Sequence, residues 1–96
     1  MKPNLDNPAV FGACIGSTFR AGDRIEFSLA EVNPLPRSPH APRSEPFSLV
    51  FLGPSNPILP QATYRLTHDR LGQLDIFIVP VGPDPQGRIQ YEAVFN

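Results

Sequence analysis

The stretch Leu74–Val81, LDIFIVPV, decides the fold of this 96-residue chain. Side chains of a β-strand alternate between the two faces of a sheet. The alternation divides the stretch into two sets: Leu74, Ile76 and Ile78, and Asp75, Phe77, Val79 and Val81. Both sets carry large apolar side chains, whereas an antiparallel sheet with one face in water needs only one apolar face. Something is therefore expected to cover the second face, either another part of this chain or another molecule.

Pro80 adds a second expectation for the same stretch. Proline has no N–H group to donate to a neighbouring strand, so it is confined to edge strands, strand ends and bulges. We expect the strand to meet an edge or a bulge at this position.

Five further segments alternate or carry the residue types of short strands. They are residues 18–20, 25–32, 47–53, 58–68 and 88–95. The alternation of the second segment slips after Leu29, and a bulge near Ala30–Glu31 would return Val32 to the apolar face. Consecutive short strands with short connections favour an antiparallel arrangement.

One short helix is predicted near the N-terminus. Asp6 or Asn7 can cap it, Pro8 suits its first position, and Gly16 can end it. Its apolar face would be formed by Val10, Phe11, Cys14 and Ile15. A helix of two turns is unstable alone in water, so it must pack on the sheet. It is one of two candidates to cover Phe77 and Val79; the other is a partner molecule.

The chain has 13 prolines, nearly three times the average share of about 5%. Since proline breaks helices and is excluded from central strand positions, short strands between rigid loops are favoured. We therefore predict one mainly β domain over residues 1–96. The expected architecture is a small antiparallel six-stranded barrel or a two-layer sandwich with one short N-terminal helix.

The charge balance argues against two classes of partner. Eight Lys and Arg oppose nine Asp and Glu, a formal net charge of −1, so no global field attracts nucleic acid or an anionic membrane. No apolar run is long enough to span a bilayer, and MKPNLDNPAVFG lacks the apolar core of a secretory signal. We expect no nucleic-acid partner, no membrane partner and a cytoplasmic location, which fits the single Cys14.

Residues 33–46, NPLPRSPHAPRSEP, form a proline-rich segment predicted to be an exposed loop. Arg37, His40 and Arg43 recur every three residues, the period at which a polyproline helix aligns its side chains. They would form a small basic ridge for an acidic partner, or the segment is simply a solvated loop.

The residues that could carry chemistry are few. His40, His68 and Cys14 have no metal-ligand spacing, and no base accompanies a nucleophile, so we predict no catalytic residue, no metal and no cofactor. His68, Asp69 and Arg70 cluster between two strands, where a hydrogen-bonded turn is favoured over a functional site. Asp75 is expected either at the wet end of its face or paired with Arg65 or Arg88, which would help to fix strand register.

Three segments, EPFSLVFLGP, LPQATYRLTHDRLGQLDIFIVPVG and YEAVF, resemble a bacterial family of small proteins classed as a domain of unknown function. The resemblance covers roughly residues 18–96, and PAVFGACIGSTF fits it more loosely. It implies a compact β-rich domain whose genes lie near those of phage-tail-like collar proteins. It implies no activity and no catalytic residue.

Two functions are compatible with these features. The first is a non-enzymatic interaction or assembly module that docks on a protein partner or self-associates through its apolar strand surface. The second is a β-barrel that binds a small ligand at its mouth or under the proline-rich loop. An enzyme would require His68 within hydrogen-bond reach of a serine or Cys14 in a cleft. The candidate ligand-binding or partner-binding residues are Arg37, His40, Arg43, Tyr64, Arg65, His68, Phe77, Val79 and Tyr91.

Overall fold

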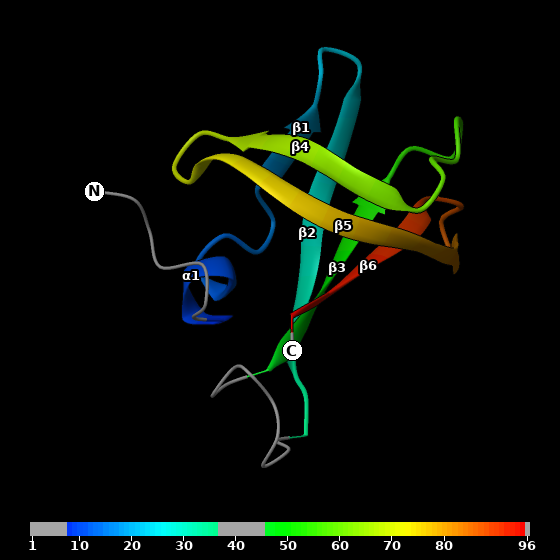
Figure 1. The fold of residues 1–96 in the computed structure, drawn as a ribbon. Helices are drawn as coiled ribbons and strands as arrows, with labels where there is room; N and C mark the ends of the chain where they lie inside the picture. Colours follow the sequence, from blue (N-terminus) through cyan, green and yellow to red (C-terminus); the bar gives the residue numbers. More distant parts are fainter. Residues whose placement is uncertain (1–7, 37–45, 96) are drawn as a thin grey trace.

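The computed structural model describes residues 8–36 and 46–95, which form one short helix and a closed antiparallel β-barrel (Figure 1). The elements in chain order are α1 (Pro8–Gly12), β1 (Thr18–Ala21), β2 (Ile25–Pro34), β3 (Phe47–Gly53), β4 (Ala62–His68), β5 (Gly72–Pro83) and β6 (Ile89–Phe95). The strands follow one another around the barrel in the order β1-β2-β3-β6-β5-β4. The predicted mainly β fold with a short N-terminal helix is confirmed, and the barrel is the correct alternative.

The inward side chains of the strands form the core, as the alternation predicts. On β5, Leu74, Ile76 and Ile78 are 5%, 4% and 0% exposed. The buried apolar residues are Phe11, Cys14, Phe19, Phe27, Leu29, Phe47, Leu49, Phe51, Leu66, Leu74, Ile76, Ile78, Ile89, Tyr91 and Ala93. Since aromatic and aliphatic side chains fill the interior, the barrel is held together by a single apolar core.

Both predicted irregularities of the strands are present. The register between β2 and β3 shifts between Leu29 and Glu31, and Val32 then packs against the core. The register between β5 and β6 shifts between Pro80 and Gly82. Pro80 therefore lies at a bulge, one of the two places expected for it, where a missing N–H group costs least.

Helix α1 lies at one end of the barrel and not over β5. The Phe11 ring lies 5.9 Å from that of Phe47 and 5.7 Å from that of Phe95, and the helix contacts β2. Cys14 is buried, as the helical spacing predicts, but Ile15 is 52% exposed. The prediction for Ile15 is wrong because the helix already ends at Gly12, and the chain turns before Gly16, whose φ is +88°. The capping residues proposed for the helix, Asp6 and Asn7, lie outside the described residues.

The loop predicted over residues 33–46 begins later than expected, because Asn33 and Pro34 belong to β2. Strand β2 continues to Pro34, which pairs with Phe47, and the N–H group of Leu35 donates to the carbonyl of Pro46 over 2.9 Å. The period-two alternation had ended earlier, so the sequence placed the end of this strand too soon. Arg37, His40 and Arg43 lie outside the described residues.

Gly53, at the end of β3, is the position where the core has no room for a side chain. A Cβ atom there would lie 2.9 Å from Cε1 of Tyr91 and 3.1 Å from Cε1 of Phe27. Both rings are fully buried and pack edge to face, with centroids 5.2 Å apart. The rings therefore occupy the space beside the glycine and cannot withdraw into solvent.

We expect Gly53→Ala to lower the free energy of unfolding by about 1–3 kcal/mol, because the added methyl group overpacks a filled core. Urea unfolding followed by circular dichroism would measure the change. Gly12→Ala is the matched control, since a Cβ there meets nothing within 4 Å. Equal unfolding midpoints for the two variants would contradict the packing argument.

Candidate functional site

The seam between β1 and β4 is closed mainly by side chains. Within the described residues, the two strands pair at one position, Arg20 opposite Thr67. The guanidinium of Arg20 adds a 2.7 Å ion pair with Asp69, and the ring of Phe19 lies 4.5 Å from that of His68. Side-chain contacts of Phe19 and Arg20 on β1 with His68 and Asp69 thus connect β1 to β4 and close the barrel.

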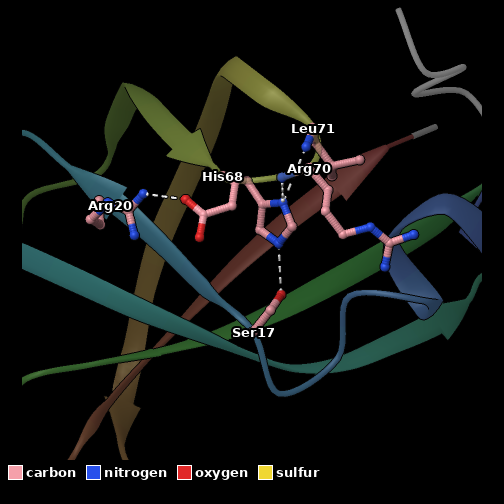
Figure 2. A network of polar contacts seen from close by, with 6 residues as sticks. Ser17, Arg20, His68, Arg70 and Leu71 are labelled. Atoms are coloured by element: carbon pink, nitrogen blue, oxygen red, sulfur yellow. Dashed lines mark hydrogen bonds and ion pairs between the residues drawn. The ribbon is translucent and has the colours of Figure 1, made fainter.

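His68 is the centre of this seam (Figure 2). Its Nδ1 accepts hydrogen bonds from the backbone N–H groups of Arg70, at 3.0 Å, and Leu71, at 3.2 Å. A nitrogen that accepts in this way carries no proton, so the neutral ring is protonated on Nε2. That N–H group then donates to the hydroxyl of Ser17 over 2.8 Å, and the hydroxyl donates to the carbonyl of Cys14. Every polar group in the chain of bonds has a partner.

The Ser17–His68 pair resembles a nucleophile and its base in distance alone. A base must accept the serine proton, but here Nε2 already carries a proton, and the oxygen of Ser17 accepts a hydrogen bond from this N–H group. His68 is 3% exposed, and neither residue borders the hollow described below. The arrangement is that of a structural hydrogen-bond chain, in agreement with the turn that the sequence favours for residues 68–70.

Burial of the His68 ring lowers its pKa below the ordinary value. Folding therefore favours the neutral ring. The stability that His68 contributes is complete above the pKa of about 6.5 that the residue has in the unfolded chain. As the pH falls through about 6.5 toward the lower folded pKa, that contribution is lost, because the unfolded chain takes up a proton first.

We therefore expect the wild-type domain to lose stability between about pH 7 and 5, and His68→Asn to lose less over the same interval. Urea midpoints at each pH would measure it. Asp69, whose pKa is lowered by its hydrogen bond from Arg20, would act only at lower pH. Parallel curves for the two proteins would show that His68 does not cause the loss.

A second feature lies on the outside of the barrel, where β3, β6 and β5 are neighbours. In one row Val50 pairs with Glu92 and Glu92 with Val79. Phe77 is two residues before Val79 on β5, and Val94 is two residues after Glu92 on β6, so both side chains point to the same side of the sheet as that row. Phe77 is 52% exposed and Val94 is 51% exposed. We name the surface formed by Val50, Phe77, Val79, Glu92 and Val94 the β3–β6–β5 outer face. It is the second face of LDIFIVPV, and α1 does not cover it.

The charged groups around this face differ in their pairing. Arg65 lies opposite Asp75 and binds it at 3.1 Å, so the expected cross-strand pair is confirmed, and Arg88 pairs with Asp84. Glu92 has no ion pair within residues 8–36 and 46–95. Arg65 on β4 and Arg88, which precedes β6, are therefore already paired with carboxylates of their own.

The predicted barrel-mouth residues do not form one site. Tyr91 is completely buried, and its hydroxyl accepts the N–H group of Leu59 over 2.9 Å. The hydroxyl of Tyr64 donates to the carbonyl of Pro60, and Arg65 is engaged by Asp75. With His68 inside the seam, these four side chains anchor loops and strands, so the expectation that they surround a ligand is not supported by their geometry. The strand pattern does not reveal that the loop residues Leu59 and Pro60 engage the two tyrosine hydroxyls.

A hollow of about 410 Å³ lies elsewhere, beside the turn between β1 and β2. Its lining includes Arg24, Glu26, Leu52, Pro54 and Arg88. Sequence reasoning missed this hollow because its walls come from segments that only the closed barrel brings together. In the part of the chain that the structure describes, no three potential metal ligands gather. No helix there is long and apolar enough to cross a membrane.

Comparison with known proteins identifies one family. The family model of the domain of unknown function DUF6916 matches residues 7–95. No match was found among the curated proteins or among the solved structures. The family match agrees with the resemblance in the sequence and includes the segment of α1, which fits that resemblance more loosely.

Proposed function

The chain belongs to the DUF6916 family, and from this premise we propose that it is a non-enzymatic interaction module. It docks a protein partner on the β3–β6–β5 outer face. The observation that carries the proposal is the exposure of Phe77 in the middle of β5, together with the exposure of Val94 on β6. Complete burial of a large apolar side chain that is exposed to water contributes about 1.5–3 kcal/mol of favourable free energy.

The rest of the face supports the same function. Val81, the extra residue of the bulge, is 55% exposed, and Val50 and Val79 in the row next to Phe77 are partly buried. These side chains stand on hydrogen-bonded strands of a closed barrel. The face is therefore preorganised, which lowers the entropy cost of docking. An assembly role in the tail-associated setting that the resemblance implies is one form of this proposal.

Site-specific crosslinking tests the proposal. Phe77 is replaced by a photoreactive phenylalanine analogue, and the protein is irradiated in lysate of the source organism and separately alone. We expect a discrete adduct that competing wild-type protein suppresses. The same analogue at Ile15, which is equally exposed at 52%, is the matched control. Adducts at Ile15 but none at Phe77 would rule out docking on this face.

The hollow beside the β1–β2 turn favours a second candidate function, binding of a small ligand. Arg24 borders it and has no ion pair within the described residues, so a cation is free to bind a polar ligand. Thermal unfolding with a panel of metabolites and nucleotides would test this, with Leu52→Trp to fill the hollow. A flat response across the panel would remove the candidate.

A further inference from the structure

The row of residues across the β3–β6–β5 outer face alternates acid and apolar side chains. Glu31 on β2 pairs with Val50 on β3, which pairs with Glu92 on β6, which pairs with Val79 on β5. Neighbouring strands are about 4.8 Å apart, so the backbones of Glu31 and Glu92 are about 10 Å from each other, with Val50 between them.

Among residues 8–36 and 46–95, neither carboxylate has an ion pair. Glu31 accepts a hydrogen bond from the amide of Asn33 at 3.2 Å, and Glu92 makes no ion pair within residues 8–36 and 46–95. Two arginines of the neighbouring segments are already engaged, Arg65 by Asp75 and Arg88 by Asp84. The face therefore combines exposed apolar surface with two negative charges that lack a counter-charge.

We infer, on the basis of the proposed function, that the partner is a protein segment in which Lys or Arg side chains flank apolar ones. Covering Phe77 and Val94 would also remove water from Glu92, which is already partly buried. A carboxylate that loses water without gaining a positive partner is strongly unfavourable. The segment must therefore bring its own cations to the positions of Glu92 and Glu31.

A second copy of this chain fits the face less well. A two-fold symmetric contact places the same patch on both sides. Glu92 would then face a copy of this same patch, which offers no unpaired cation among the described residues, so its carboxylate would lose water without gaining a positive partner. A basic, apolar segment of a different protein has no such penalty.

Synthetic peptides provide the test. Three extended peptides of equal length are titrated into ¹⁵N-labelled protein: alternating Val and Lys, alternating Val and Glu, and alternating Ser and Lys. We expect amide shifts centred on Phe77, Glu92 and Val94 with the Val/Lys peptide only, weaker at high salt. Equal binding of the Val/Glu peptide, or shifts centred outside this face, would overturn the inference.

Two substitutions that change the net charge equally distinguish a defined cation position from attraction to net charge. Glu92→Lys is expected to weaken binding of the Val/Lys peptide about tenfold or more, because one attractive charge becomes repulsive. Asp23→Lys, in the exposed β1–β2 turn, is the control and should leave the affinity within about twofold. Equal losses in the two variants would indicate attraction to net charge alone and would contradict a defined cation position.

The inference and the proposed function fail separately. If Phe77 crosslinks to a protein but Glu92→Lys does not change that adduct, the docking face stands and its partner is not selected by charge. If the adduct is a second copy of this chain, the face is a self-association surface and the inferred segment is wrong. If Phe77 gives no adduct and no peptide binds, both proposals fall.

Discussion

Ile78→Ala is expected to lower the free energy of unfolding by about 2–5 kcal/mol, whereas Phe77→Ala, one residue earlier, should change it by less than about 1 kcal/mol. Ile78 is 0% exposed inside the barrel, so truncation removes buried contacts and leaves a cavity. The Phe77 ring is 52% exposed on the outer face, and its loss removes little buried surface.

Urea unfolding of the two variants and the wild type would measure this contrast. The comparison is well controlled because the two residues are adjacent on β5 and differ in the face that they occupy. An equal destabilisation of both variants would mean that Phe77 is covered in solution. That outcome would itself point to a self-associated form, which sedimentation at several concentrations would reveal.

His68→Ala is expected to cost a similar amount, about 3–5 kcal/mol. The substitution leaves the N–H groups of Arg70 and Leu71 without their acceptor and removes the donor to Ser17. Each buried polar group left unpaired costs about 1–3 kcal/mol, and a cavity beside Phe19 adds to the loss. Since β1 and β4 share a single paired position, the backbone cannot compensate.

His68→Asn separates hydrogen bonding from packing. An asparagine side-chain oxygen can accept backbone N–H groups two or three residues ahead, as in common turns. We expect this variant to recover about 1–2 kcal/mol of the loss. Hydrogen exchange of the Arg70 and Leu71 amides would report the same bonds directly, with fast exchange in the alanine variant and partial protection in the asparagine variant. Unchanged protection in His68→Ala would show that the ring does not hold the turn.

The sequence predicted the strands well because each strand has one face in the same core. On β3 the residues at alternating positions, Phe47, Leu49 and Phe51, are all completely buried. The bulges at residues 29–31 and at Pro80 were also predictable, since one follows from a slip in the alternation and the other from a missing N–H group. Periodicity is a local property, so no tertiary information was needed.

The prediction was less accurate where a residue's role depends on distant parts of the chain. Tyr91 and His68 are among the candidate binding residues, yet the hydroxyl of Tyr91 accepts the N–H group of Leu59, and His68 binds Ser17, which is 51 positions away. Likewise the place of α1 depends on the ring of Phe11 meeting Phe47 and Phe95, from two strands that pair with each other. None of these pairings leaves a pattern in a single segment.

For LDIFIVPV, the sequence by itself determined the strand, its two apolar faces and the irregularity at Pro80. These follow from side-chain alternation and proline chemistry, which act within a few residues. Only the tertiary structure decided that the sheet closes into a barrel, that α1 packs at its end, and that Phe77 stays uncovered. Those outcomes depend on which strands pair and how their side chains fill one shared interior, and that is a property of the whole chain.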